Sequence, residues 1–485
     1  MMKNLRIKAL HGAKWATIQN GLGQVIDFII FITLARLLGP EEFGLVAIAI
    51  VVISLMSPFV TQGLGAAIVQ KEKLESEHKD SVFWVNLAVG LLLTVFLVST
   101  SDILASVFSV SQLAPVLSCV AFSFLFISLT TVQEALVRRE LRIKELAVRS
   151  LIAKLIGGVL GVLLALNDFG VWSLVVKQLA TALINMALLW KISTWRPRFR
   201  FSKVHFQELY PFGLKVLGNE VLVFVNRRSA HLIIAYFLGA VALSFYNIAN
   251  RFMMLFLRLI TQSVRQVGMP LFSRIQNSPE KVQKGFLEIS QIIALISIPL
   301  FCGGSVLAPE IVSLLLGEKW LPAVPVFQIL MLVGIVQSLL SPMVSVLVGL
   351  GYPGLRLKLQ CIDAVVNIIG FFVAVHWGIV TVAYTYTVIG FLLWPLWYIT
   401  VKKVVFIDTV EYFKIIIGPI VGTTVMAIWI IETQQSQLSF VGLTSTIFSV
   451  VTGAIVYVLI MHFFFQSTSK KMMHIILDIF VKTGK

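Results

Sequence analysis

The sequence predicts an all-α membrane protein with about fourteen transmembrane helices, and three observations lead to this fold class. Of the 485 residues, 58% are hydrophobic and only 13% are charged, whereas soluble domains average about 25% charged residues. The mean hydropathy is +0.93. The apolar residues form continuous runs of roughly 20 residues, which is the length that spans a bilayer. These runs must be helices, because lipid satisfies no backbone hydrogen bond and a barrel would need short alternating strands.

Each predicted helix is one such apolar run, bounded by polar residues or by glycine and proline. The runs cover residues 14–37, 43–64, 81–101, 113–134, 150–167, 170–190, 211–237, 241–266, 285–307, 322–349, 359–376, 379–400, 413–432 and 439–464.

Basic residues predict how these helices are oriented. Residues at helix ends are counted with the adjoining loops. On this basis 30 of the 39 Lys and Arg residues lie in the tails and in loops after even-numbered helices, two (Arg36 and Lys319) lie in loops after odd-numbered helices, and seven lie well inside helices. Because basic loops stay on the cytoplasmic side, both termini are expected in the cytoplasm. The charge is spread over all loops of that side, which favours contact with anionic membrane lipids and argues against a nucleic acid partner.

Motifs for other chemistry are missing from the sequence. The three cysteines lie in apolar stretches without C-x-x-C spacing, so we expect no metal site, and no cofactor motif occurs. The run Gly157, Gly158 and Gly161 lacks the Lys-Ser/Thr of a phosphate loop, so it is expected to let helices pack closely. No D-x-D pair occurs and the outer loops are short, so the chain is not expected to be an enzyme.

An internal repeat relates residues 35–62 to residues 235–262. Eight of these 28 aligned positions are identical, including a Leu-Gly pair and a Thr-Gln pair. Six helices separate the two copies, so both enter the membrane in the same direction, as in a parallel repeat about an axis along the membrane normal.

The repeat predicts three parts of the chain. Residues 1–205 and 206–408 would form two six-helix lobes around a central cavity, and residues 409–485 would add two extra helices and a basic cytoplasmic tail. A transport site is expected between such lobes.

Charged residues inside the predicted helices are the candidate site, because each costs about 2.5–3.5 kcal/mol at membrane depth unless it faces water or a partner. Arginine pairs with phosphate and carboxylate groups, so the residues expected to bind an anion in a cationic cavity are Arg228, Arg251, Arg258, Arg227 and Lys177. The acids Asp27, Glu220 and Asp363 are candidates for ion coupling or for counter-charges. Lys154 and Lys215 are expected to extend toward the cytoplasmic interface.

One stretch of the sequence resembles a known family. The segment from Ala35 to Ala47, ARLLGPEEFGLVA, is followed after the second helix by QGLGAAIVQ, residues 62–70. Both are similar to the polysaccharide transporter branch of the multidrug/oligosaccharidyl-lipid/polysaccharide exporter superfamily, and most similar to the Wzx-type flippases that serve colanic acid and related exopolysaccharides. The sharp motif covers only this region, and it identifies kinship without identifying a substrate.

The resemblance implies a flippase of the bacterial inner membrane that moves undecaprenyl-diphosphate-linked oligosaccharide repeat units of exopolysaccharide, colanic acid or O-antigen type by alternating access. A polysaccharide polymerase and chain-length machinery would be its partners. The alternatives are a lipid II flippase, a cation or drug antiporter of the same superfamily and, further away, an integral membrane glycosyltransferase or polymerase. A surplus of basic residues in the membrane disfavours the antiporter of cations.

Overall fold

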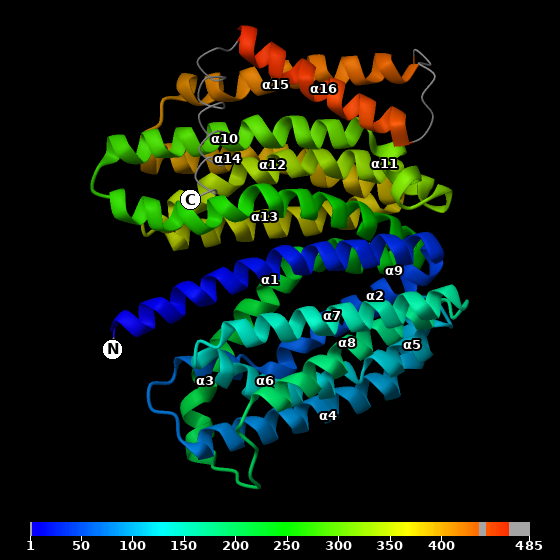
Figure 1. Cartoon of the computed structure of the whole chain (residues 1–485), viewed down its shortest axis with the longest axis vertical. Coiled ribbons are helices and arrows are strands. Elements are labelled where there is room, and N and C mark those ends of the chain that lie inside the picture. Colours follow the sequence, from blue (N-terminus) through cyan, green and yellow to red (C-terminus); the bar gives the residue numbers. More distant parts are fainter. Residues whose placement is uncertain (1, 436–442, 465–485) are drawn as a thin grey trace. The chain divides into compact units, whose positions relative to one another are not determined.

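The computed structural model describes residues 2–435 and 443–464, with side chains for all of these except residues 2–10, 13, 226, 227, 263, 265–267 and 443 (Figure 1). Every regular element in these ranges is a helix, which confirms the predicted fold class. The α-helices are α1 Met2–Leu37, α2 Pro40–Thr61, α3 Leu64–Gln70, α4 Ser76–Val107, α5 Leu113–Val120, α6 Ser123–Arg139, α7 Ile143–Leu166, α8 Val171–Ile192, α9 Lys203–Ile275, α10 Pro279–Val306, α11 Ala308–Leu315, α12 Val324–Gly349, α13 Pro353–Ala374, α14 Ile379–Val405, α15 Thr409–Gln435 and α16 Leu443–Phe464, with 3-10 turns η1 Glu318–Ala323 and η2 Val375–Trp377.

Thirteen segments in the described residues are long and apolar enough to cross a membrane. The fourteenth predicted span stays a prediction, and the difference lies in α9. This helix runs from Lys203 to Ile275 with a break at Gly239, where φ is 80° and ψ is −174°. Only the stretch Arg228–Gln262, which crosses the break, is apolar enough to count as a span. Polar residues such as Lys215 and Glu220 lower the hydropathy of the first half of α9.

Two compact units divide the chain, Met1–Ser244 and Phe245–Lys485. In the first unit α7 packs against α1 and α8, and α4 packs against α5 and α6. In the second unit α10 packs against α12 and α15, α14 packs against α12 and α13, and α16 packs against α15. The lobe boundaries 1–205, 206–408 and 409–485 stay predictions.

Glycines hold the first unit together. A Cβ atom added at Gly157 would lie 2.1 Å from Thr181 Oγ1 on α8, and one at Gly158 would lie 1.9 Å from Ile30 Cδ1 on α1. Such distances leave no room for a side chain, so the backbone of α7 lies directly against both neighbours. The prediction that this glycine run allows close helix packing is therefore confirmed.

The family-like motif builds two turns of the first unit. Pro40 opens α2, and the Gly39 amide donates a hydrogen bond to Glu42 Oε2 at 2.9 Å, which satisfies a free amide at the helix start. Gly63 follows α2 with φ of 65°, and a Cβ atom there would lie 2.4 Å from the carbonyl oxygen of Gly213. A residue with a side chain would be strained and would also collide with α9.

The two copies of the repeat share a break in the helix. Gly39 lies between α1 and α2, and its counterpart Gly239 interrupts α9. The aligned glycines therefore occupy the same place, the junction between two consecutive helices.

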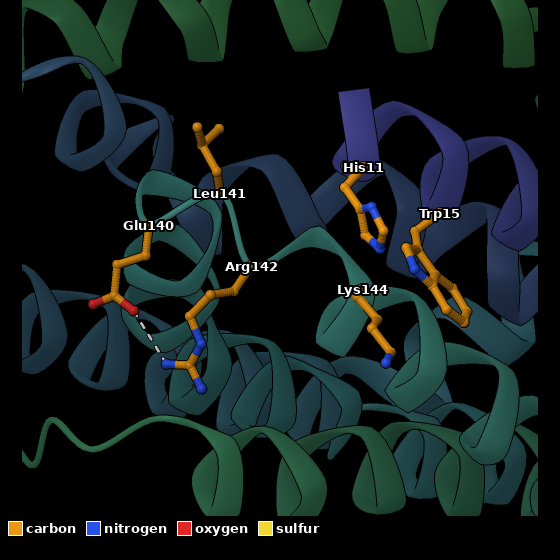
Figure 2. A pocket seen from close by; sticks show the side chains of 7 residues that line it. His11, Trp15, Glu140, Leu141, Arg142 and Lys144 are labelled. Carbon is orange, nitrogen blue, oxygen red and sulfur yellow. Dashed lines mark hydrogen bonds and ion pairs between the residues drawn. The ribbon is translucent and has the colours of Figure 1, made fainter. Parts of the chain in front are cut away.

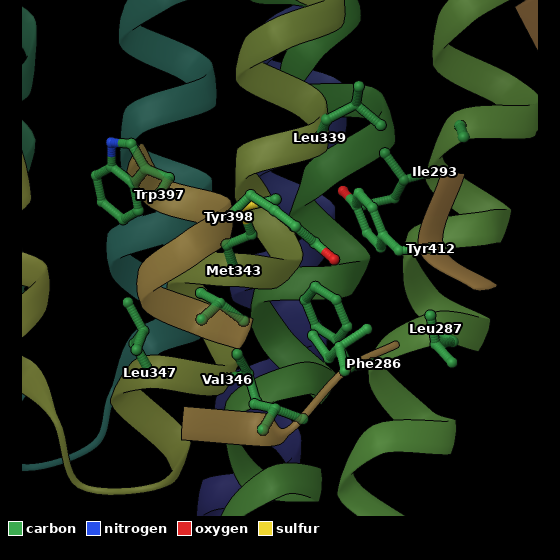
Figure 3. Packing of buried hydrophobic residues seen from close by; sticks show 14 of the residues in the cluster. Phe286, Leu287, Ile293, Leu339, Met343, Val346, Leu347, Trp397, Tyr398 and Tyr412 are labelled. Carbon is green, nitrogen blue, oxygen red and sulfur yellow. The ribbon is translucent and has the colours of Figure 1, made fainter. Parts of the chain in front are cut away.

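Large aromatic side chains fill the core of the second unit (Figure 3). Phe286 and Tyr412 stack with ring centroids 5.9 Å apart, and Trp394 and Tyr398 stack at 5.8 Å. Figure 3 shows the rings of Phe286 on α10, Tyr398 on α14 and Tyr412 on α15 close to one another and to Met343 on α12. Burial of such rings supplies most of the packing area in a core of this kind.

Candidate functional site

The clearest charged contact inside the membrane-spanning helices joins α1 to α7. Lys154 Nζ donates to Asp27 Oδ2 at 2.6 Å, and the two side chains are 32% and 39% exposed. The space for the ammonium group comes from Gly23, where an added Cβ atom would lie 3.3 Å from Lys154 Nζ. Lys154 thus bonds an acid across the helix interface, where the sequence led us to expect an extension toward the cytoplasmic interface.

Four other predicted site residues of the first unit lie on α8 and α9. Lys177 is half-buried, and its aliphatic stem packs on α7, where a Cβ atom at Gly161 would lie 2.8 Å from Lys177 Cβ. Arg228 is also half-buried, whereas Glu220 is exposed. The Arg227 side chain lies outside the described residues.

The predicted residues of the second unit differ in exposure. Arg251 is half-buried and Arg258, two turns further along α9, is exposed. Asp363 on α13 accepts hydrogen bonds from Trp397 Nε1 on α14, at 3.2 Å to Oδ1 and 3.0 Å to Oδ2. The described contacts therefore join Asp27 to Lys154 and Asp363 to Trp397.

Sequence reasoning missed the partners in both contacts. The sequence does hold a signal for the first, because an acid and a base inside two spans of one lobe stabilise each other in lipid. Trp397 gave no such signal, since tryptophan is common near the membrane interface and its indole N–H rarely marks a partner.

A hollow of about 270 Å³ lies where α1 meets the turn between α6 and α7. Figure 2 shows His11 and Trp15 on one side and Arg142 and Lys144 on the other. Lys144 Nζ lies 5.3 Å from the centre of the Trp15 ring, a cation–π contact. Glu145, and then Glu140, raise the pKa of the Arg142 guanidinium above its ordinary value.

The charge balance of this hollow differs from that of an anion site. Arg142 donates to Glu145 at 2.8 and 2.5 Å and to Glu140 at 3.1 Å, so two carboxylates already neutralise it. Lys144 is the other basic side chain among the lysines and arginines that line the hollow, and its ammonium group contacts the Trp15 ring. The lysines and arginines inside the membrane-spanning helices are therefore better candidates for binding an anion than those of this hollow.

Comparison with solved structures supports the fold. The chain superimposes on an inward closed conformation of the lipid II flippase MurJ with a TM-score of 0.74 at 15% identity, over 94% of this chain and 99% of that one. An inward-facing multidrug resistance MATE family transporter of the MOP superfamily gives a TM-score of 0.62 at 14% identity, over 79% and 95%. At these identities the likeness establishes the architecture alone.

Comparison with known sequences identifies the family. A succinoglycan biosynthesis transport protein of Rhizobium meliloti is 30% identical over 67% of this chain and 66% of that protein. A teichuronic acid biosynthesis protein of Bacillus subtilis is 25% identical over 97% and 99%, and a lipopolysaccharide biosynthesis protein of Escherichia coli is 25% identical over 71% of both chains. Residues 33–325, more than half of the chain, match the polysaccharide biosynthesis protein family, and the chain belongs to that family.

Proposed function

We propose that this multi-pass membrane protein translocates an oligosaccharide joined through a diphosphate to a polyprenyl lipid, of the undecaprenyl type, across the bacterial inner membrane by alternating access. The observation that carries the proposal is the family membership, together with relatives named for succinoglycan biosynthesis transport and for lipopolysaccharide biosynthesis. Both termini would lie in the cytoplasm, and a polysaccharide polymerase and chain-length machinery would take over the product.

The bases inside the spans match the charge of such a substrate. Lys177, Arg228 and Arg251 are half-buried in helices that cross the membrane. A guanidinium group pairs with phosphate through two parallel hydrogen bonds, whereas a sugar offers neutral hydroxyls and the prenyl tail offers none. We assign the diphosphate to these bases and leave the tail in lipid. Arg258 and Arg227 complete the proposed basic set. The acids Asp27, Glu220 and Asp363 are proposed for ion coupling or as counter-charges.

Transfer of a defined lipid-linked repeat unit into proteoliposomes tests the proposal. Arg228→Ala and Arg251→Ala are each expected to slow transfer about 10- to 100-fold, the effect of losing one hydrogen-bonded charge pair to phosphate. Arg274→Ala is the matched control, because Arg274 is an exposed arginine of the same helix beyond the span. Unchanged transfer in both variants would remove the site assignment.

Lipid II is the second candidate substrate, because the solved structure with a TM-score of 0.74 is a lipid II flippase. The same vesicles loaded with lipid II separate the two candidates. Transfer of the oligosaccharide repeat unit in preference to lipid II supports the proposal, and the reverse preference replaces it. Efflux of a cationic dye without either lipid substrate would favour an antiporter.

A further inference from the structure

We infer that the first unit holds a binding site for a zinc-type transition-metal dication, formed by Glu75, His78, His205 and Glu208. Glu75 and His78 begin α4, and His205 and Glu208 lie in the first two turns of α9, about 130 residues later in the chain. We call these four residues the histidine–glutamate cluster. The proposal is independent of the transported substrate.

Three members of the histidine–glutamate cluster lie close together, and Glu208 lies beside one of them. His205 Nε2 lies 3.2 Å from Glu75 Oε2, and His78 Nε2 lies 3.2 Å from Glu208 Oε2. One ligand atom each from Glu75, His78 and His205 lies within 4.8 Å of the others. Ligands bound at about 2.0–2.2 Å to a tetrahedral zinc ion lie about 3.3 Å from one another. Small rotations of Glu75, His78 and His205 would bring three ligand atoms to coordination distances, and Glu208, which already lies beside His78, would supply the fourth.

The chemistry of the cluster fits a dication with borderline softness. Two imidazoles and two carboxylates form a mixed nitrogen and oxygen set that suits zinc, and two carboxylates neutralise its charge. Mg²⁺ and Ca²⁺ prefer oxygen ligands alone, so the two imidazoles disfavour them. The His78 side chain is 3% exposed and that of His205 is 25% exposed, so the imidazole side of the site is shielded from water.

The backbone around the cluster is fixed by contacts that do not involve the ligand atoms. Ser202 N donates to Ser81 Oγ at 2.9 Å, and Arg198 N donates to Asp80 Oδ1 at 3.1 Å, which ties the chain before α9 to the first turns of α4. Arg139 donates to the carbonyl oxygen of Ile68 at 2.8 Å and holds the end of α3. Sites held on such a rigid scaffold lose little freedom when a metal binds.

The hydrogen bonds made by the Nδ1 atoms decide which histidine tautomers bind the metal. His205 Nδ1 lies 2.6 Å from Ser202 Oγ, so a proton on Nδ1 is satisfied there while Nε2 faces the metal. His78 Nδ1 accepts the Glu75 amide at 3.2 Å, so binding through Nε2 moves the His78 proton to Nδ1 and releases this long bond. No net proton leaves the site in either shift.

Lys71 allows a prediction of tighter metal binding, because it lies beside one of the proposed ligands. Its ammonium group pairs with the carboxylate of Glu208, so it competes with a cation for one ligand. Lys71→Gln removes this competitor without touching a donor atom and is expected to tighten metal binding about 10-fold, whereas His205→Gln and Glu75→Gln are expected to weaken it.

The experiment is a zinc titration of the full chain in detergent, purified on a histidine-free tag, stripped with a chelator and followed by calorimetry. We expect one equivalent to bind, at least 100-fold weaker binding in His78→Gln and His205→Gln, and unchanged binding in His376→Gln on the second unit. Cobalt should give the visible spectrum of a tetrahedral site. Zinc should raise the melting temperature of the parent and not of His205→Gln.

Since His78 is buried and His78→Gln risks misfolding, the His205 and Lys71 variants decide whether the site exists. Failure to bind one equivalent, or binding indifferent to both, overturns the site.

Discussion

The two units each place an acidic side chain inside a membrane-spanning helix, and they satisfy it in different ways. In the first unit Asp27 contacts the ammonium group of Lys154 at 2.6 Å. In the second unit Asp363 accepts hydrogen bonds from the neutral indole of Trp397. A cationic partner favours the ionised form of a carboxyl group, whereas a neutral hydrogen-bond donor is compatible with both the ionised and the protonated form. From these contacts we propose a counter-charge role for Asp27 and an ion-exchange role during transport for Asp363.

The helices around these two acidic residues also pack in different ways. The first unit brings helix backbones together at Gly157 and Gly158, whereas the second fills its core with the rings around Phe286 and Tyr412. Close packing of α1 on α7 brings Asp27 and Lys154 within bonding reach. In the second unit, Trp397, the partner of Asp363, belongs to the same buried cluster as Phe286 and Tyr412. The interfaces of α7 in the first unit should therefore be sensitive to added atoms, and the aromatic cluster of the second unit to removed ones.

Adding one methyl group at a close helix contact of the first unit and at an open position of the second should give a clear contrast. Gly157→Ala places a Cβ atom 2.1 Å from Thr181 Oγ1, so α7 and α8 must separate, at a cost of about 2 kcal/mol. Gly303→Ala in the second unit meets its nearest atom at 3.5 Å, an ordinary contact, and should be neutral. Unfolding in detergent measures both. Adding Thr181→Ala to Gly157→Ala should restore part of the loss, and equal losses in the two units would contradict the contrast.

Removing the Lys154 ammonium group should come next. Lys154→Ala leaves the Asp27 carboxylate without its lysine, at a cost of about 1–2 kcal/mol, reduced from the value of a fully buried pair because both side chains are partly exposed. Exchanging the two charges, Asp27→Lys with Lys154→Asp, should recover more stability than either single change retains. Thermal unfolding of the four proteins gives the coupling energy, and a coupling near zero would show that the pair is incidental.

Neutralising Asp363 should disturb stability less than neutralising Asp27. Asp363→Asn keeps an oxygen for the Trp397 indole, so the expected loss is below about 1 kcal/mol. If Asp363 exchanges an ion, the same variant should abolish the dependence of transport on pH or sodium while Asp27→Asn keeps it. Transport in vesicles with imposed gradients reads this out. An unchanged gradient dependence would return Asp363 to a structural role.

The smallest effect is expected at Tyr412 in the second unit. Its hydroxyl is buried and has no hydrogen-bond partner among the described residues. Tyr412→Phe should therefore be neutral or stabilising by up to about 1 kcal/mol, since the ring contact with Phe286 remains. Phe286→Ala, the matched truncation, should cost about 3–4 kcal/mol because it leaves a cavity. A loss above about 1 kcal/mol for Tyr412→Phe would show that the hydroxyl has a partner.

Much of the fold followed from the sequence because the period and length of apolar runs are set by the bilayer itself. The break in α9 at Gly239 fell where the sequence predicts an interruption, between 211–237 and 241–266. The glycine run of α7 was also foreseeable, because adjacent small residues in a span have few other uses.

The contacts of the site were harder to foresee. Whether Lys154 reaches water or Asp27 depends on the rotation of α7 against α1, and no spacing within one helix encodes that rotation. The histidine–glutamate cluster shows the same limit, because His78 and His205 lie on helices whose first turns are brought together only by the fold.

The Gly63 turn has a consequence for how relatives of this chain are recognised. Its backbone has φ of 65° and touches Gly213 so closely that no other amino acid fits there. The motif around Gly63, residues 62–70, is therefore required by the bend of the backbone at this position. A sequence search with this motif would find chains that share this bend, and it would not distinguish them by the sugar that each one transports.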